Sequence, residues 1–240
     1  MELFILRMTP YREKDFIITA LSPNGLVSFK AGGLSKPTSK FSGIVTLYAL
    51  VDAELEEKKT GLLITNAVAI SKNYKIISDY NKLSALNFIG EACLRILHDQ
   101  DDVSQVFLFV KTAILALEQD YDPFSLSFIV IAKLLKAVGY GLNVDSCVRC
   151  GAKKDIVAIS YLDGGFVCRK DFDRQTCHPL SVEALNIIRY AFLVPIDKML
   201  TLKFDNQELI TLFDGLTDFY QDVTNTHLKS YTIFRQSLKS

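Results

Sequence analysis

The 240-residue sequence contains no long hydrophobic run, and this absence argues against a membrane protein. Its most apolar stretch, Phe124 to Val138, is interrupted by Lys133 and Lys136, whereas a spanning helix needs about 20 consecutive apolar residues. With 49% hydrophobic residues the chain can still bury a substantial core. We therefore expect one or two globular domains and no membrane partner.

The chain also has no excess of charge of one sign, because 27 basic residues balance 27 acidic ones. A nucleic-acid-binding domain is often strongly basic, so any case for such a partner must rest on local charge. Nothing at the N-terminus resembles a secretory signal, which predicts a cytoplasmic location and argues against disulfides.

Histidine is scarce, with three residues in the whole chain, so an open catalytic zinc site built on histidine is not expected. The sequence offers no acid/base pair either. The adjacent Cys177 and His178 do not suit a nucleophile and its base, since neighbouring side chains point in different directions in most backbones. We expect no enzymatic activity.

Cysteines are few as well, yet four of the five lie in one short segment. Cys147 and Cys150 have the Cys-x2-Cys spacing that lets two thiolates converge on one tetrahedral ion, and Cys168 follows a double-glycine turn. A second Cys-x2-Cys would need a cysteine where Asp171 stands, but Cys177 and His178 follow. This pattern predicts a structural zinc site; the alternative is a set of reduced cysteines without metal.

The N-terminal part, residues 1–78, has the pattern of a small β-barrel. Short apolar runs alternate with turn sequences such as Ser22-Pro23-Asn24-Gly25 and Lys58-Lys59-Thr60-Gly61. The expected strands are Leu3–Arg7, Phe16–Leu21, Leu26–Ala31, Ile44–Val51 and Leu62–Ala69.

Residues 79–240 have helical periodicity, interrupted by the cysteine-rich segment at 145–179. One helix should begin at Asp122-Pro123 and another after Ser181, a suitable N-cap. The fold class is therefore α+β, a barrel followed by an all-α domain. Helices are expected over residues 83–97, 106–117, 123–138, 181–193, 206–220 and 226–238.

The barrel contains one region suited to phosphate. No acidic residue occurs between Phe16 and Val51, while Lys30, Lys36 and Lys40 lie in or beside the small-residue loop 31–39. Such a loop lets the backbone approach a phosphate, and lysines add charge without sequence preference; the alternative is a solvated hairpin loop. Three aromatic residues are candidates for base stacking, although strand aromatics more often belong to the core: Phe29, Phe41 and Tyr48.

These motifs, in this order, resemble the bacterial RecO DNA-repair proteins over essentially the whole chain. The resemblance rests on four stretches of sequence together with the two cysteine motifs Cys-x2-Cys-Gly and Gly-Gly-x-x-Cys. The four stretches are Tyr11-Arg12-Glu13-Lys14-Asp15, Lys30-Ala31-Gly32-Gly33, Phe128 with Leu134-Leu135 and Gly139, and His227-Leu228-Lys229-Ser230-Tyr231.

The resemblance implies an OB-fold barrel, a helical domain and, in many members, a zinc-binding segment. RecO-like proteins bind single- and double-stranded DNA, anneal complementary strands and, with RecR, help load RecA onto DNA coated by single-strand-binding protein (SSB). For this chain we expect phosphate contacts from five residues: Arg12, Lys14, Lys30, Lys36 and Lys40. An alternative is an adaptor that binds proteins through its helical domain and has little affinity for DNA.

The chain departs from the family pattern at Asp171, where the usual fourth cysteine is missing. Thiolate is the softer ligand and suits a structural zinc site better than a carboxylate. We therefore predict Cys147, Cys150, Cys168 and Cys177 as the zinc ligands, with Asp171 and His178 as alternatives for the fourth position.

Overall fold

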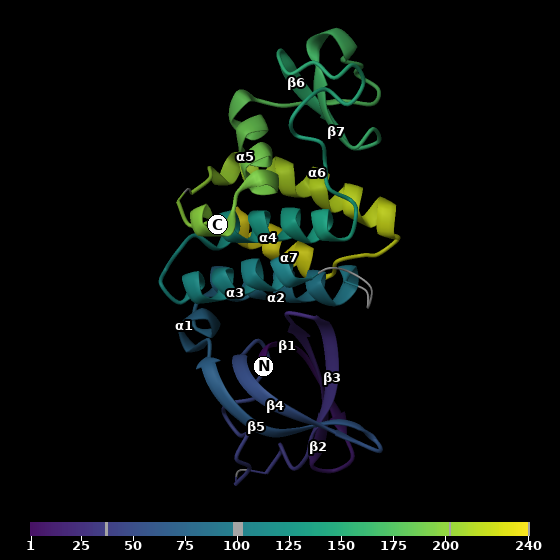
Figure 1. The fold of residues 1–240 in the computed structure, drawn as a ribbon. Coiled ribbons are helices and arrows are strands. Elements are labelled where there is room, and N and C mark those ends of the chain that lie inside the picture. The colour runs from purple at the N-terminus through teal and green to yellow at the C-terminus, as the bar shows by residue number, and fades with distance from the viewer. Residues whose placement is uncertain (37, 98–102, 202, 240) are drawn as a thin grey trace.

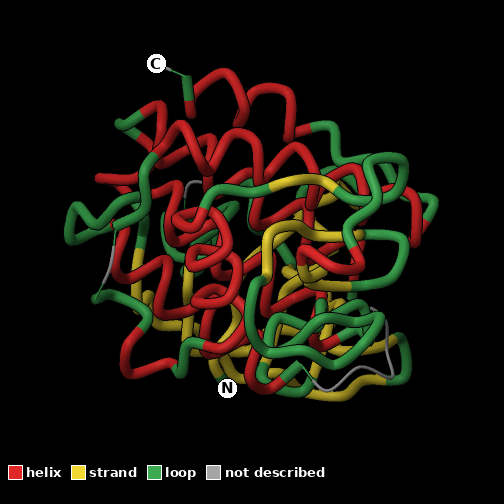
Figure 2. The backbone as a smooth tube through the Cα atoms, turned by 90° about the horizontal axis from the view of Figure 1, so that it is seen from above, coloured by secondary structure: helices red, strands yellow, loops and turns green. Residues whose placement is uncertain are grey.

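The structure is a computed structural model that describes residues 1–36, 38–97, 103–201 and 203–239. Three layers follow one another along its long axis (Figure 1): a β-barrel, a layer of helices and a small cysteine-rich sheet. Figure 2 views the same stack from above, so that helices and strands overlie one another. None of the described helices combines the length and the hydropathy needed to cross a bilayer.

The N-terminal barrel is closed, with strand order β1-β2-β3-β5-β4 and β4 paired to β1. Neighbouring strands are antiparallel except β3 and β5, which meet in parallel at Lys30 and Leu63. Five strands closed in this way are consistent with an OB-fold. The strands are β1 (Glu2–Tyr11), β2 (Asp15–Ser22), β3 (Gly25–Ala31), β4 (Leu50–Lys58) and β5 (Gly61–Ser71).

The fourth predicted strand, Ile44–Val51, is wrong, because the strand runs from Leu50 to Lys58. Residues 38–49 form mostly turns, and Tyr48 has a left-handed backbone with φ of 62°. Val45 and Ala49 are apolar because they fill the barrel core from this turn-rich segment. The sequence did not predict the observed strand because its exposed positions are acidic, a pattern that is typical of a solvated loop. These positions are Asp52, Glu54, Glu56 and Glu57.

The predicted helices are all present. Asp79, Asp122 and Ser181 accept hydrogen bonds from backbone N–H groups at the starts of their helices, as N-caps do. A four-residue helix, α1 (Tyr74–Ile77), leads from the barrel into this layer. The longer helices are α2 (Tyr80–Ile96), α3 (Ser104–Leu117), α4 (Pro123–Ala137), α5 (Val182–Leu193), α6 (Asn206–Thr224) and α7 (Ser230–Leu238).

The cysteine-rich segment contains a small sheet that the sequence did not predict. Its strand order is β7-β6-β8, with β6 (Ile156–Ser160) in the centre between β7 (Gly165–Cys168) and β8 (His178–Pro179). A 3-10 turn, Arg169–Asp171, directly follows β7. These strands are too short to show periodicity, and their pairing joins residues as far apart in the sequence as Ala158 and Pro179.

Barrel and helices share a core. Phe4, Leu21 and Leu50 are fully buried and belong to the same apolar cluster as the helices. Tyr48 lies in this seam, where its hydroxyl donates to Asn87 Oδ1 at 2.8 Å. A side chain at Gly90 would collide with the Tyr48 ring, so the glycine permits close packing of α2 on the barrel.

Candidate nucleic-acid interface and metal site

Asp15 joins the β1–β2 turn to the glycine loop that follows β3. Its Oδ1 accepts a hydrogen bond from the Gly33 N–H at 2.8 Å, and its Oδ2 pairs with Lys30 Nζ at 2.9 Å. The Ser35 N–H also donates to the Lys14 carbonyl at 3.3 Å. The bond from Gly33 and the contact with Lys30 hold the pKa of Asp15 below its usual value.

This connection gathers four of the five predicted DNA-contacting residues at one rim of the barrel. Lys14 lies in the turn, Lys30 pairs with Asp15, and Lys36 follows the glycine loop, with its N–H bonded to the Gly33 carbonyl at 3.0 Å. Arg12 begins the same turn, with a left-handed backbone at φ of 57°. The sequence has no acidic residue between Phe16 and Val51, so the loop was expected to lack an acidic neighbour. Asp15 lies just before this stretch, and the fold brings it to Lys30.

Lys40, the fifth predicted residue, lies close by along β5. Its ammonium donates to the Thr65 carbonyl and stands 5.0 Å from the centroid of the Phe41 ring. Thr65 is two residues beyond Leu63, the β5 partner of Lys30. Pro37, between the two loop lysines, lies outside the described residues. The DNA-binding role of these five cations stays a prediction.

Tyr11 is a candidate that sequence reasoning did not single out as a site residue. Its side chain is 40% exposed, and two cations lie near its ring, the Arg12 guanidinium at 5.2 Å and Lys30 Nζ at 5.6 Å from the centroid. A hollow of about 300 Å³ lies beside it, between the β1–β2 and β4–β5 turns, and includes Ser28 and Gly61 in its lining. An aromatic residue directly before an arginine in a turn was the available signal.

The three aromatic residues proposed for stacking are occupied elsewhere. Phe29 and Phe41 belong to the barrel core, and Tyr48 packs against α2. Phe29 lies in β3, whereas Phe41 and Tyr48 lie in the turn-rich segment, and all three rings pack within the protein.

The metal site has a different membership from the predicted one. The ligand atoms of Cys147, Cys150, Cys168 and Asp171 all lie within 4.8 Å of one another. The thiols of Cys147 and Cys168 lie 3.2 Å and 3.3 Å from Asp171 Oδ2, and the sulfurs of Cys150 and Cys168 are 3.6 Å apart. Four such atoms around one centre could hold a metal ion.

The fourth position is a correction, since Asp171 stands where we predicted Cys177. The 3-10 turn after β7 carries Asp171 back towards Cys168, so that Cys168-x2-Asp171 repeats the Cys147-x2-Cys150 geometry. The Cys177 sulfur is not one of these four atoms, although Cys177 packs in the same small apolar core as Cys147 and Cys168, and it lies 3.8 Å from Thr176 Oγ1. The spacing of the turn therefore accounts for which atoms lie together, and binding of zinc by them stays a prediction.

The thiols and the carboxylate of this cluster shift one another's pKa values. Hydrogen bonds from the thiols of Cys150, Cys147 and Cys168, in that order, lower the pKa of Asp171. The same carboxylate raises the pKa of the Cys150 thiol to about 12. A bound cation would lower the pKa of the thiols as well as that of the carboxylate, because it stabilises both anions.

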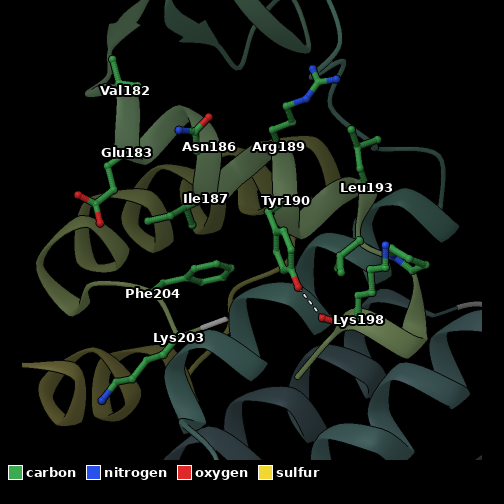
Figure 3. A pocket seen from close by; sticks show the side chains of 12 residues that line it. Val182, Glu183, Asn186, Ile187, Arg189, Tyr190, Leu193, Lys198, Lys203 and Phe204 are labelled. Atoms are coloured by element: carbon green, nitrogen blue, oxygen red, sulfur yellow. Dashed lines mark hydrogen bonds between the residues drawn. The ribbon is translucent and has the colours of Figure 1, made fainter. Parts of the chain in front are cut away.

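A separate apolar groove of about 850 Å³ lies between α5 and five residues that follow it, Val194, Pro195, Lys198, Lys203 and Phe204. Figure 3 shows Ile187, Tyr190 and Phe204 turned towards its centre, with the Tyr190 hydroxyl bonded to the Lys198 carbonyl. The Tyr190 and Phe204 rings meet edge to face, with centroids 5.7 Å apart. Four charged side chains also line it: Glu183, Arg189, Lys198 and Lys203.

Comparison with known protein families accounts for both halves of the chain. The family model described as "Recombination protein O N terminal" matches residues 1–74, and "Recombination protein O C terminal" matches residues 77–232. The chain belongs to the recombination protein O (RecO) family. The resemblance inferred from the sequence motifs is thereby confirmed, and the barrel and the helical layer coincide with the two RecO regions.

Individual RecO relatives are distant but extend along nearly the full length. The DNA repair protein RecO of Bacillus subtilis (strain 168) is 22% identical over 229 residues, which cover 94% of this chain and 89% of the relative. That of Thermoanaerobacter sp. (strain X514) is 25% identical over 208 residues, or 84% of this chain and 83% of the relative. That of Bacillus pumilus (strain SAFR-032) is 24% identical over 235 residues, or 97% and 91%.

Proposed function

We propose that this chain is a DNA-repair and recombination mediator of RecO type. It binds single- and double-stranded DNA, anneals complementary strands and, with RecR, assists RecA loading on DNA coated by SSB. The observation that carries the proposal is the cationic rim around Tyr11 on a five-stranded barrel. Family membership supports the repair role. We propose no catalytic centre and a cytoplasmic location.

DNA binding would rest on the phosphate backbone. Arg12, Lys14, Lys30, Lys36 and Lys40 supply charge, while Tyr11 offers an exposed ring to an unpaired base. Barrels of this type commonly hold single strands by charge and stacking, with little base readout. Because each phosphate contact releases counterions, affinity should fall steeply with salt.

We further propose that Cys147, Cys150, Cys168 and Asp171 hold a structural zinc ion. Zinc bonds of about 2.3 Å to sulfur and about 2.0 Å to oxygen give tetrahedral edges of about 3.8 Å between sulfurs and about 3.5 Å between sulfur and oxygen. The corresponding separations here are 3.6 Å, 3.2 Å and 3.3 Å. A bound ion would be held by residues of the knuckle, of β7 and of the 3-10 turn, and so would cross-link three segments that the short strands do not hold strongly by themselves.

We propose the groove beside α5 as the surface that binds the acidic tail of SSB. Apolar side chains of such a peptide would pack on Tyr190 and Phe204, and its carboxylates would pair with the lysines and the arginine of the lining. Arg189 and Lys203 retain acidic partners of their own, Asp145 at 2.8 Å and Asp122 at 3.8 Å. Lys198 has no acidic partner within ion-pair distance among the described residues. We also propose RecR as a partner, and we assign no surface of this chain to it.

The first experiment is fluorescence anisotropy of a labelled single-stranded oligonucleotide at about 50 mM and about 200 mM salt, with strand annealing measured in parallel. We expect binding that weakens steeply with salt and an accelerated annealing rate. The double variant Lys36→Glu, Lys40→Glu should abolish binding and leave thermal unfolding unchanged. A matched control is Lys153→Glu, Lys154→Glu in the exposed cysteine-rich segment.

The groove also favours a second candidate, an adaptor that works through its helical domain. This reading predicts negligible oligonucleotide affinity at the lower salt, together with tight binding of an acidic, apolar peptide. Unchanged DNA affinity in the Lys36, Lys40 variant would contradict our assignment of the interface. No DNA binding by the unmodified protein would favour the adaptor.

A further inference from the structure

One side chain of the metal-binding segment bonds to three neighbouring stretches of chain. Arg149 lies inside the knuckle, directly before Cys150. Its Nε and Nη2 donate to Asp163 Oδ2 at 2.9 Å and 2.6 Å, its Nη1 donates to the Asp171 carbonyl at 2.6 Å, and its Nη2 also reaches Thr176 Oγ1 at 2.8 Å. The guanidinium therefore links the knuckle to the β6–β7 turn, to the 3-10 turn and to the loop before Cys177.

The groups that Arg149 contacts are themselves anchored. Asp163 accepts a hydrogen bond from the Ser160 hydroxyl at 2.9 Å, at the end of β6. Thr176 donates to Asp173 Oδ2 at 2.9 Å. A planar guanidinium with several donors can serve such divergent acceptors at once, which a lysine ammonium does less well. Arg149 is thus held in a defined position and its bond to the 3-10 turn is directional.

The bond to the Asp171 carbonyl matters because Asp171 is the exceptional ligand. A carboxylate is a less favourable partner than thiolate in a structural zinc site, and this carboxylate is carried by a turn of only three residues. Retention of the ion then depends strongly on how well the turn is pre-positioned. Partners that orient a ligand typically change metal affinity about 10- to 100-fold when they are removed.

We propose that Arg149 is a positioning residue of the metal site, which keeps the Asp171 carboxylate against the three thiolates and so sets how slowly the ion is lost. This inference rests on the proposed zinc site. It assigns to Arg149 no contact with the ion and no contact with DNA.

The test uses the full-length, zinc-loaded protein and measures zinc transfer to a chromogenic chelator. We expect Arg149→Ala to release zinc about 10- to 100-fold faster than the unmodified protein, and Arg149→Lys to fall between them. The matched control is Arg169→Ala, which removes an exposed cation of the same segment and should leave the rate unchanged. Equal rates for Arg149→Ala and the unmodified protein would overturn the inference, and so would equal acceleration by Arg169→Ala.

Cobalt substitution separates positioning from general loosening, since its visible bands report the ligands and geometry around the ion. The Arg149 variants should show weakened or shifted bands relative to the unmodified protein, and a spectrum identical to it would refute the positioning role. If Arg149→Ala does not fold, Arg149→Lys decides the question in both assays. Failure of the unmodified protein to bind zinc or cobalt would instead reject the zinc proposal itself, a result distinct from a normal release rate in the variants.

Discussion

Asp15 illustrates how a single residue governs both the shape and the charge of the barrel rim. It holds the glycine loop through Gly33 and at the same time pairs with Lys30. The same carboxylate therefore organises the surface proposed to meet phosphate and opposes it electrostatically. Removal of the Asp15 charge should therefore raise the affinity for DNA and lower the free energy of unfolding at neutral pH.

We expect Asp15→Asn to bind single-stranded DNA more tightly. The amide can still accept the Gly33 hydrogen bond, while Lys30 becomes available to a phosphate. The slope of log affinity against log salt should steepen by about one unit per added phosphate contact. Anisotropy titrations at several salt concentrations measure this, with Asp222→Asn on α6 as a control for general charge. Unchanged affinity and slope would contradict a DNA-facing role for Lys30.

The stability contributed by Asp15 should depend on pH. The Gly33 bond and Lys30 lower its pKa in the folded state, so its contribution is fully present above the unfolded-state pKa of about 4. It is lost as the pH falls through the folded-state value. Urea unfolding of the unmodified protein and of Asp15→Asn should therefore differ more at pH 7 than at about pH 2. A difference independent of pH would rule out this ionisation as the source.

Tyr11 should contribute to single-stranded binding through its ring. Truncation in Tyr11→Ala should cost about 1–3 kcal/mol of binding free energy for a single strand, the usual range for one stacked base. Tyr11→Phe keeps the ring and should bind nearly as well as the unmodified protein. Anisotropy with single- and double-stranded oligonucleotides tests this. Equal losses on both substrates would mean that Tyr11 supports the fold of the rim and does not stack on a base.

At the scale of elements, the β6–β7 hairpin depends on close backbone contact with the chain that enters the knuckle. The Phe166 N–H donates to the Asn143 carbonyl at 2.9 Å, and the Asn143 N–H donates to the Gly164 carbonyl at 2.8 Å. A Cβ atom on Gly165 would lie 2.3 Å from the Asn143 carbonyl oxygen. Only glycine fits between these two strands of chain.

Gly165→Ala should therefore separate the hairpin from the knuckle and displace Cys168 from the other ligands. We expect a cost of roughly 1–3 kcal/mol, as for overpacking elsewhere, confined to the segment 143–179. Hydrogen exchange should show faster exchange there and unchanged protection in α2 and α4. Gly32→Ala is the control, because its added carbon would meet only the Asp15 carboxylate at 3.8 Å. Unaltered protection of β6 and β7 would disprove the packing argument.

At the scale of the whole molecule, barrel and helices behave as one packed body. Their apolar core is continuous, and Lys111 on α3 pairs with Glu2 on β1 at 2.5 Å. Glu118, at the end of α3, accepts hydrogen bonds from the Ser71 hydroxyl and the Asn73 N–H at 2.6 Å and 3.2 Å. The rim that we propose for DNA binding and the apolar groove are therefore held in a defined relation to each other.

Phe4→Ala should destabilise both layers together. Phe4 is fully buried in the seam and stacks on Tyr48, so its truncation should cost about 3–5 kcal/mol. Calorimetry should show one transition at lower temperature, with loss of protection in the barrel and in α2 at the same time. Leu162→Ala serves as a control, because Leu162 is 81% exposed. Barrel unfolding that leaves α2 protected would show that the two layers are independent.

Local sequence was sufficient for much of this architecture. Helix periods, the N-caps at Asp122 and Ser181, and the Cys147-x2-Cys150 knuckle all depend on interactions within a few residues. The hairpin turns at 22–25 and 58–61 are of the same kind, and the order of motifs along the chain was enough to indicate the RecO family. Each of these features is determined by residues that are close together in the sequence.

Other features depend on which distant segments meet, and no local pattern contains that information. Asp171, not Cys177, joins the three thiols because a 3-10 turn after β7 brings it back to them. The apolar run 44–49 fills the barrel core instead of forming a strand, and Lys30 reaches the ring of Tyr11 only because the barrel brings β3 beside the β1–β2 turn. Short-range preferences select the elements, whereas burial and long-range pairing decide which side chains share a site.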